Sequence, residues 1–374
     1  MIDTNNNTVV AIIGAGIGAQ HLDGYRAHPE LFAVKTICDL NTERATELAN
    51  GSQAQVTGDF DSVLRDKDID LIDICLPPHL HYETIVKALE AGKHVICEKP
   101  LVGSVAETDK VIAAAERTGK QVFPVFQYRY GKGLDQLRAL IDAGLAGKAY
   151  AASLETHWNR GSAYYAVPWR GTWAGEAGGA VLGHAIHNHD LLTYVLGPVE
   201  NVTALTSTRV NPIEVEDCAA IIMQMHSGAL VTSSITLGAA TDTTRIRVCF
   251  EGFTATSGTE PYAPGKGSWT FEARAPMDQS RIDATLAALE PEPQGYAGFF
   301  KAVAMGLDGD PSRVVTLKDG RRSLEFVTAV YHSARTRQMV SLPLEKEHPL
   351  YSGWQPDIAT PELSVHQQHS QQQQ

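Results

Sequence analysis

Three short stretches of this 374-residue sequence combine side chains that could transfer protons or bind a hydroxylated ligand. In the first, Glu98-Lys99-Pro100, the lysine follows an apolar run, His94 to Cys97, that predicts a buried strand. Burial lowers the pKa of a lysine, which suits it to proton transfer or to polarising a carbonyl. We therefore predict that Lys99 is catalytic, and that Pro100 is a candidate for a cis peptide bond.

The second stretch is a predicted helix with three histidines. His184 and His187 are three residues apart, so they would share one face of that helix. Asp190 extends this face, whereas His189 points elsewhere. Histidine is the side chain best matched to acid–base catalysis near neutral pH. His187 and His184 are therefore predicted to be catalytic together with Lys99.

Both stretches also have a structural interpretation. Glu98-Lys99-Pro100 could form a surface turn, and the histidines could pack in the core with their polar atoms satisfied. A zinc site formed by His184, His187 and Glu155 is a further alternative, but the stretch lacks the H-E-x-x-H spacing of a strong zinc motif. We therefore predict no metal site.

The third stretch runs from Glu155 to Trp173 and interleaves aromatic rings with arginines. Aromatic faces can stack on a sugar ring, and guanidinium groups donate hydrogen bonds to its hydroxyls. Tryptophans that only pack in the core are the alternative. The residues predicted to contact substrate are Tyr128, Arg129, Glu155, His157, Arg160, Tyr164, His184 and His187.

A glycine turn near the start of the chain predicts a cofactor. Gly14, Gly16 and Ala19 follow an apolar run and fit the G-x-G-x-x-G/A spacing of dinucleotide-binding turns. Gly14 would allow the tight turn, Gly16 the approach of a pyrophosphate, and Ala19 the packing of the helix on the strand. The N–H groups at the start of that helix would bind the phosphates. A structural turn in another α/β protein is the alternative.

The next predicted strand ends in Asp39, about where a carboxylate would bind the ribose 2′-hydroxyl of NAD. The first cation after it is Arg44, one helical turn further on. We therefore predict NAD as the cofactor and consider NADP the weaker ligand, because Asp39 would repel a 2′-phosphate.

The elements that must position these residues alternate between strand and helix. We predict strands at Val9–Ile13, Phe32–Cys38, Ala54–Thr57, Leu71–Leu76, His94–Cys97 and Gln121–Phe126, with helices such as Thr42–Ala49, Tyr82–Ala91 and Ala106–Arg117 between them. This alternation predicts an α/β fold with a Rossmann, doubly wound parallel sheet. Ligands bind beyond the carboxyl ends of such strands, where the candidates lie.

The pattern changes after about residue 128. Long alternating strands predict a large, open, mainly antiparallel sheet, and we expect them at Ala149–Trp158, Val199–Thr208, Ala219–Met225, Leu230–Leu237 and Thr244–Phe250. We divide the chain into an NAD-binding domain at 1–127, an α/β domain for substrate binding and oligomerisation at 128–350, and a partly disordered tail at 351–374 that ends in a His- and Gln-rich run.

The composition excludes several classes of protein. A net charge of −12 argues against binding to nucleic acid or to an anionic membrane. We see neither a leader peptide nor an apolar run of about 18 residues, so we expect no membrane anchor. The five cysteines lie mostly in apolar runs without a C-x-x-C pair, which predicts reduced thiols in a cytoplasmic protein.

Taken in order, these motifs resemble the glucose–fructose oxidoreductase / inositol dehydrogenase / rhizopine catabolism (Gfo/Idh/MocA) family over roughly residues 8 to 345. The resemblance rests on Gly14-Ala15-Gly16, Glu98-Lys99-Pro100, Trp169-Arg170, and Gly178-Gly179 with His187 and Asp190. It implies a Rossmann domain and a C-terminal α/β domain whose open sheet joins the subunits of a dimer or tetramer. It also implies oxidation or reduction of a sugar or cyclitol carbon with NAD(P).

The resemblance further implies roles for single residues. It matches Lys99 and His187 to the family's lysine and histidine, and Trp169-Arg170 to a pair near the cofactor. With the strand ends, the predicted cofactor-binding residues are Gly14, Gly16, Ile17, Gly18, Asp39, Leu76, Pro77, His79, His81, Glu98, Lys99, Gln127, Trp169 and Arg170. Many members carry an aspartate four residues before the histidine; Gly183 stands there, so His184 or Asp190 would have to replace it.

The function expected from these features is an NAD-dependent oxidoreductase that acts on a ring carbon of a sugar, glycoside or cyclitol. One alternative is an NAD-dependent glycoside hydrolase, in which transient ring oxidation permits elimination of the aglycone. Its extra acid and base would come from His184, His157 and Glu155. A non-catalytic nucleotide-binding sensor is the other alternative, which the presence of both Lys99 and His187 disfavours.

Overall fold

The computed structural model describes residues 7–356, which form two sheets with their covering helices. The first sheet has six parallel strands in the order β3-β2-β1-β4-β5-β6. Its strands are β1 (Thr8–Ile13), β2 (Phe32–Cys38), β3 (Gln55–Thr57), β4 (Leu71–Ile74), β5 (His94–Cys97) and β6 (Val122–Pro124). This strand order is that of a doubly wound dinucleotide-binding fold, which confirms the predicted Rossmann sheet.

Helices connect these strands and cover both faces of the sheet, which is why its central strands are apolar on both sides. They are α1 (Gly18–Arg26), α2 (Thr42–Ala49), α3 (Phe60–Arg65), η1 (Pro78–Leu80), α4 (His81–Glu90) and α5 (Val105–Thr118). Side-chain caps start three of them: Asn41 accepts a hydrogen bond from Arg44 N–H, Asp59 from Ser62 N–H, and Ser104 from Glu107 N–H. Gly119, with a φ of 65°, ends α5.

The second sheet has eight strands in the order β13-β12-β11-β7-β10-β9-β8-β14. Its strands are β7 (Ala149–Asn159), β8 (Val199–Ser207), β9 (Cys218–Met225), β10 (Leu230–Thr236), β11 (Gly238–Phe250), β12 (Phe253–Thr256), β13 (Thr270–Ala273) and β14 (Val340–Ser341). Only β7 and β10 pair in parallel, so the prediction of a mainly antiparallel sheet is confirmed.

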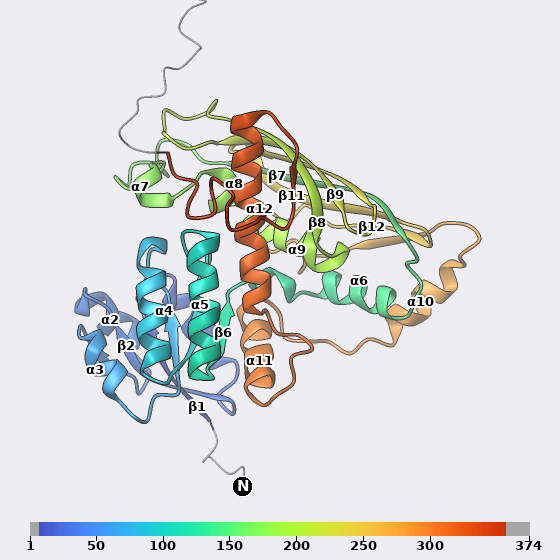
Figure 1. Ribbon diagram of the computed structural model, residues 1–374. Coiled ribbons are helices and arrows are strands. Elements are labelled where there is room, and N and C mark those ends of the chain that lie inside the picture. Colours follow the sequence, from blue (N-terminus) through green and yellow to red (C-terminus); the bar gives the residue numbers. More distant parts are fainter. Residues whose placement is uncertain (1–6, 357–374) are drawn as a thin grey trace, which may run out of the picture.

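The remaining helices cover one face of this sheet and join it to the first. They are η2 (Gln127–Arg129), α6 (Lys132–Asp142), α7 (Trp173–Glu176), α8 (Ala180–Gly183), α9 (Ile186–Leu196), α10 (Gln279–Ala287), α11 (Gly295–Leu307) and α12 (Leu317–Thr336). The long helix α12 stands between the two sheets and packs on both α5 and β8 (Figure 1). Helix α11 packs on α1, where Phe300 stacks on Tyr25 with ring centroids 3.9 Å apart.

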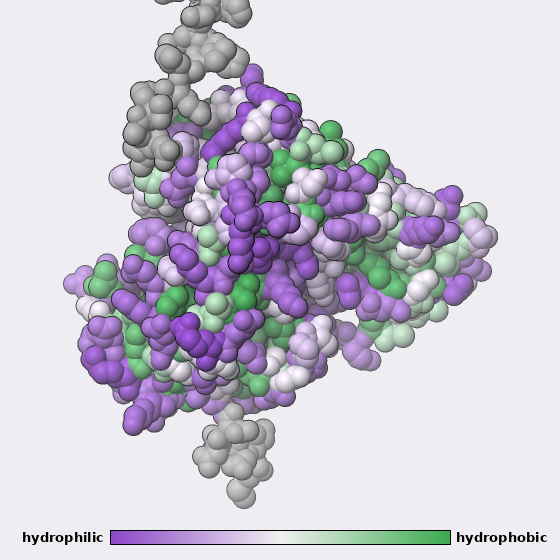
Figure 2. All heavy atoms as spheres, in the orientation of Figure 1, coloured by the Kyte–Doolittle hydropathy of each residue, from purple (hydrophilic) through white to green (hydrophobic). Residues whose placement is uncertain are grey.

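The other face of the second sheet is open. Along β7 to β10, buried and exposed side chains alternate, and the exposed set includes Leu205, Ile222 and Leu230. Figure 2 shows the side of the molecule that carries α12, where hydrophilic atoms follow that helix and some hydrophobic atoms lie beside it. An apolar open face of this kind is typical of a protein–protein contact.

Two predictions about the elements need correction. The predicted helix after Gly179 is interrupted at His184 and Ala185, so α8 and α9 are separate. The predicted tail also begins too early, because Tyr351 and Trp354 are buried and the Trp354 indole donates a hydrogen bond to the Ala177 carbonyl, 2.7 Å away. The His- and Gln-rich end of the chain lies outside the described residues.

Candidate active site

The glycine turn after β1 has the geometry that a pyrophosphate requires. Gly14 adopts a φ of 103°, and a Cβ atom on it would lie 2.5 Å from the Cys75 carbonyl oxygen. A Cβ atom on Gly16 would meet nothing within 4 Å, so open space lies above this part of the turn. The close packing predicted for Ala19 belongs instead to Gly18, where a Cβ atom would lie 2.9 Å from Ile12.

Asp39, at the end of β2, is fixed beside this turn. Its Oδ2 atom accepts hydrogen bonds from Ala15 N–H at 2.7 Å and from the Arg44 guanidinium at 2.7 Å, and Oδ1 accepts from Asn41 N–H at 2.8 Å. Burial opposes these bonds, but they hold the pKa of Asp39 below its usual value. Oδ1 keeps a free lone pair for a ribose hydroxyl. Arg44 is closer to this site than the sequence implied.

Glu98-Lys99-Pro100 lies at the carboxyl end of β5, and the Lys99–Pro100 peptide bond is cis, as considered from the sequence. The His81 ring is bonded through Nδ1 to the Pro100 carbonyl and through Nε2 to the Leu76 carbonyl, each at 2.8 Å. Since His81 is fully buried and each ring nitrogen faces one of these carbonyls, it packs between two strand ends. Its predicted contact with the cofactor is therefore wrong.

Glu98 accepts a hydrogen bond from Lys99 N–H through Oε2, at 3.0 Å, and faces a buried polar network through Oε1. His21 on α1 approaches Asp73 through Nδ1 at 2.8 Å and Glu98 through Nε2 at 3.1 Å. Tyr25 donates to Asp73, and Tyr296 on α11 donates to Glu98, both at 2.9 Å. The network thus joins the cofactor helix, two central strands and α11 directly behind Lys99.

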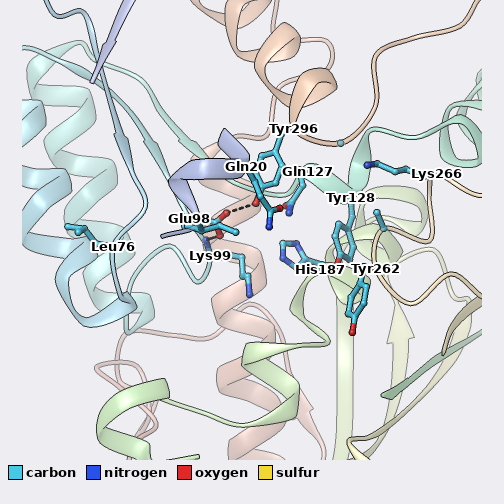
Figure 3. Close-up of a pocket in the computed structure, with 13 residues that line it drawn as sticks. Gln20, Leu76, Glu98, Lys99, Gln127, Tyr128, His187, Tyr262, Lys266 and Tyr296 are labelled. Carbon is cyan, nitrogen blue, oxygen red and sulfur yellow. Dashed lines mark hydrogen bonds between the residues drawn. The ribbon is translucent and has the colours of Figure 1, made fainter. Parts of the chain in front are cut away.

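A cavity of about 610 Å³ lies between the two sheets, at the carboxyl ends of the parallel strands. Of the predicted site residues, it is lined by Ile17, Leu76, Glu98, Lys99, Gln127, Tyr128 and His187. In Figure 3, Lys99 and His187 enter from different elements and point toward the same space, with Leu76 and Lys266 at opposite ends. The structure therefore brings together the two residues predicted to share proton transfer.

Burial controls the charge of both residues. Burial lowers the pKa of Lys99, although the nearby carboxylates of Glu98 and Glu176 raise it in part. Burial and the positive charge of Lys99 lower the pKa of His187 to about 3. His187 is stacked on Tyr128 with ring centroids 4.4 Å apart, and its Nδ1 atom has no partner among the described residues. His187 is therefore a neutral imidazole that can accept or share a substrate proton.

His184 does not line the cavity. It sits at the break between α8 and α9, and its ring packs edge-on to Trp158, with centroids 5.5 Å apart, and beside Tyr164. Burial lowers its pKa to about 3. Because the predicted helix is interrupted here, His184 and His187 do not share a helix face. The Nδ1 atom of His184 has no partner among the described residues, so its catalytic and substrate-binding role stays a prediction.

Arg129 and Asp190 are partners of each other. The Arg129 guanidinium donates to both Asp190 oxygens at 2.7 and 2.6 Å and also approaches Asp319 at 3.2 Å. All three side chains are largely buried. Arg129 therefore holds η2, α9 and α12 together, and its predicted contact with substrate is wrong. Asp190 is equally unavailable to orient His187.

Glu155 and His157 lie on the open face of the second sheet. Their neighbours on β7, Thr156 and Trp158, point to the helix-covered face, where Thr156 accepts a hydrogen bond from Asn188. His157 is bonded to Ser234 at 2.8 Å on the open face. Since successive side chains of a strand point to opposite faces, neither Glu155 nor His157 reaches the cavity. This corrects both predictions and removes Glu155 from any zinc site with the helix histidines.

The predicted aromatic and arginine cluster is connected to the cavity through Arg160, although its own residues are not among those that line the cavity. Arg160 donates to Asp242 at 2.9 Å and to the Tyr262 hydroxyl at 2.8 Å, so it holds a ring that lines the cavity. The Arg170 guanidinium stacks on Tyr164 at 4.1 Å and on Trp169 at 4.7 Å, and Trp169 is 45% exposed. These exposed aromatic faces stay predicted ligand contacts, as do Pro77 and His79 at the exposed start of η1.

The family follows from two model matches. An oxidoreductase family model with an NAD-binding Rossmann fold matches residues 8–126, and a model of the GFO/IDH/MocA C-terminal domain matches residues 134–255. The chain belongs to the Gfo/Idh/MocA oxidoreductase family. Its cofactor is NAD, which the glycine turn and Asp39 are shaped to bind.

Three similar proteins extend this assignment. An uncharacterised oxidoreductase, YrbE, of Bacillus subtilis is 30% identical over 59% of this chain and 65% of its own length, so the match spans just under two thirds of that relative. D-glucoside 3-dehydrogenase of Escherichia coli is 26% identical over 91% of this chain and 99% of its own length. The WlbA dehydrogenase of Bordetella pertussis, solved with NADH and UDP-GlcNAcA, aligns with a TM-score of 0.79 and 26% identity over 91% of this chain and 99% of its own.

Gly183, where many Gfo/Idh/MocA members have an aspartate, leaves an open position beside the lysine. The Lys99 ammonium donates a hydrogen bond to the Gly183 carbonyl, 3.1 Å away. A Cβ atom on Gly183 would meet nothing within 4 Å. The main chain at this position therefore takes part in holding Lys99.

Sequence reasoning missed six residues of the Gfo/Idh/MocA cavity: Gln20, Tyr262, Ala263, Lys266, Gly295 and Tyr296. Most come from the loop between β12 and β13 and from the start of α11, far along the chain from the recognised motifs. A signal existed in the glycine and proline content of 261–267, which marks an ordered turn.

Within residues 7–356, no helix is long and apolar enough to cross a bilayer. One described group, His21, Asp73 and Cys75, is compact enough to hold a metal, and it is buried.

Proposed function

We propose that this protein is an NAD-dependent dehydrogenase that oxidises a ring hydroxyl of a sugar, glycoside or cyclitol. The observation that carries the proposal is the placement of Lys99 and neutral His187 on one cavity at the end of β5, next to the glycine turn. The similarity to D-glucoside 3-dehydrogenase, which extends over 91% of the chain, supports a sugar substrate.

The chain has groups suited to each part of the cofactor. The turn at Gly14 and Gly16 and the start of α1 would hold the pyrophosphate, and Asp39 the adenosine ribose. Ile17 and Leu76 offer apolar cavity wall to the nicotinamide end. When bound there, NAD supplies hydride acceptance from a carbinol carbon.

Lys99 and His187 would handle the hydroxyl proton of that carbon. Burial favours the neutral amine of Lys99, which can accept the proton as the carbonyl forms. Neutral His187 can accept a hydrogen bond from the same hydroxyl or take the proton on to solvent. Tyr128, stacked on His187, fixes the ring plane. The Gly183 carbonyl positions the Lys99 Nζ atom by accepting a hydrogen bond from it.

The glycoside hydrolase alternative loses its main support. It needs an additional base for the acidified ring C–H and an acid for the leaving group. Glu155 and His157, the expected sources, lie on the other face of the sheet, and His184 is packed against Trp158. Net dehydrogenation needs only the two groups that the cavity provides.

Incubation with NAD⁺ and nitrophenyl glycosides of several sugars separates the two functions. A dehydrogenase forms NADH in proportion to oxidised sugar and releases no nitrophenol. Nitrophenol release over many turnovers, with catalytic NAD⁺ and no accumulation of NADH, would establish the hydrolase and refute our proposal. Lys99→Ala serves as the inactive control in both assays.

We further propose that two copies of the chain associate through the open face of the second sheet. Leu205, Ile222 and Leu230 are 51 to 60% exposed there, and small side chains of the same strands lie among them. We also propose a cytoplasmic location, because all five cysteines are free. Free thiols are typical of proteins in a reducing compartment.

A further inference from the structure

We propose that the substrate carries a carboxylate and that Lys266 binds it at the end of the cavity away from Leu76. This inference rests on the proposed dehydrogenase function and adds the chemical class of its substrate: a sugar acid or a glycoside of one. Lys266 belongs to no motif of the sequence, and only the folded chain places it on the cavity.

The loop that carries Lys266 is firmly held. The Gly265 carbonyl accepts hydrogen bonds from Gly133 N–H at 2.9 Å and Leu134 N–H at 3.2 Å, at the start of α6. The Trp269 indole donates to the Pro264 carbonyl at 2.9 Å. Lys266 therefore extends from a fixed backbone, which reduces the conformational entropy lost when its ammonium binds a ligand.

The Lys266 ammonium lies directly against the first residue of α11. A Cβ atom on Gly295 would be only 2.7 Å from Nζ, so this position leaves room for the ammonium because it is glycine. Gln294 provides no side-chain cap for the helix. The Gly295 N–H itself donates to the Tyr130 carbonyl at 2.8 Å, so the Lys266 ammonium is the positive group that this end of the cavity offers to a ligand.

No described carboxylate balances this charge. Lys266 forms no ion pair with any residue between 7 and 356, whereas Lys301, further along α11, is paired with Glu292 at 2.7 Å. Glu98, the acidic residue that lines the cavity, is already engaged by His21 and Tyr296. Lys266 is exposed, so water solvates its ammonium in the free protein, and an anionic ligand would replace that water.

The charge of the whole chain does not oppose this conclusion. The net charge of −12 repels anions at long range, but salt screens that field beyond about 8 Å at physiological ionic strength. Close to Lys266, which is exposed and has no ion pair among residues 7–356, the local charge of the ammonium decides. A neutral sugar would need only uncharged partners such as Tyr128 and Gln127, whose Oε1 atom is buried without a partner.

A carboxylate fits this end better than a phosphate. A single ammonium balances the single charge of a carboxylate, whereas phosphate sites usually collect several arginines or backbone N–H groups. Arg160 and Arg170 are already paired with Asp242 and Glu176. The substrate would thus extend from its reacting carbinol, between Lys99 and His187, to its carboxylate at Lys266 (Figure 3).

The test compares acidic and neutral sugars of the same ring configuration. Initial rates with NAD⁺ are measured for methyl glucuronide against methyl glucoside and methyl galacturonide against methyl galactoside, with glucose 6-phosphate as the phosphate arm. We expect at least one uronide to exceed its neutral counterpart about tenfold in kcat/KM. Lys266→Met should remove that preference by raising KM, while kcat and the KM for NAD⁺ change little. Lys148→Met, at an exposed lysine outside the cavity, is the matched control.

Each other outcome overturns the inference in a recognisable way. Oxidation of neutral sugars in preference to uronides, or an equal effect of Lys266→Met on both, would refute carboxylate binding but leave the dehydrogenase intact. Preference for the phosphorylated sugar would show that the cavity end selects phosphate. No NADH from any acidic or neutral sugar would count against the proposed function itself.

Discussion

The Nε2 atom of His21 lies 3.1 Å from the Oε1 atom of Glu98, while Nδ1 of the same ring lies 2.8 Å from Asp73. Burial alone would lower the pKa of His21, but the charge of Asp73 and its hydrogen bond raise that pKa well above its usual value. His21 is thus a buried imidazolium between two carboxylates. Although burial opposes ionisation, His21 lowers the pKa of Glu98 to about 2, so an anion stands behind Lys99.

Glu98→Gln should shift the pH dependence of sugar oxidation. The Glu98 carboxylate raises the pKa of Lys99 against the lowering effect of burial. Oxidation requires the neutral amine, so kcat rises with pH through the pKa of Lys99. Removal of the carboxylate charge lowers that pKa, and the rising limb should move to lower pH. Glu90→Gln, on an exposed glutamate, is the control; an upward shift in Glu98→Gln would contradict the assignment.

Lys99→Ala and His187→Ala should each lower kcat by about 10²-fold or more, because each removes a group that handles the substrate proton. Binding of NADH, followed by its fluorescence, should change far less. The double variant should lose less than the product of the single effects if the two residues act as one unit. Near-normal turnover of either single variant would refute its catalytic role.

Asp39→Asn should relax the preference for NAD over NADP. The substitution keeps an acceptor for Ala15 N–H but releases Arg44 from its ion pair, so the guanidinium can approach a 2′-phosphate. We expect kcat/KM with NADP⁺ to rise about tenfold, which corresponds to ~1.4 kcal/mol. The Asp39→Asn/Arg44→Ala double variant should lose this gain; an equal gain there would exclude Arg44 as the cause.

His189→Gln should flatten the pH dependence of stability. Burial lowers the pKa of His189 to about 3, so between pH 3 and 6.5 the unfolded chain binds a proton that the folded chain does not. The resulting stability is complete above pH 6.5 and is lost as the pH falls toward 3. Glutamine can keep the hydrogen bond to Ser233 without titrating.

The measurement is urea unfolding of wild type and His189→Gln at several pH values. The free energy of unfolding should fall less steeply below pH 6.5 in the variant, by up to about 1.4 kcal/mol per pH unit for one proton. Parallel curves for the two proteins would mean that His189 titrates normally in the fold.

Ile222→Glu should dissociate the proposed assembly, because it places a charge in the centre of the open face of the second sheet. Light scattering coupled to size exclusion gives the mass directly. Leu289→Glu, at an exposed position after α10, is the control and should leave the mass unchanged. An Ile222→Glu protein with the wild-type mass would place the interface elsewhere.

The parallel sheet and its ligand-binding edge were predictable because the responsible signals are local. The apolar run before Gly14 and the position of Asp39 each specify a short segment with a known geometry. The lysine at the end of β5 and the histidine of α9 were also identified from nearby residues. For such elements, the spacing along the chain already implies the arrangement in space.

The errors came from relationships that local patterns do not contain. Glu155 and His157 were placed in the site because of their residue types, yet strand alternation puts them on the face away from Trp158 and the cavity. Arg129 was assigned to the substrate because nothing near it in the sequence indicates its ion-pair partner. That partner, Asp190, is 61 positions away. Lys266 was missed because only tertiary packing places it beside Gly295.

Gly183 has a consequence for how this family diverges. A single base change converts the glycine codons GGT and GGC into aspartate codons, and the open space at this position would accept the new side chain without moving the backbone. The lysine already bonded to the carbonyl of the same residue would gain a carboxylate neighbour at once. From either of those two codons, the common family pattern is therefore one base change away, and the fold already has room for it.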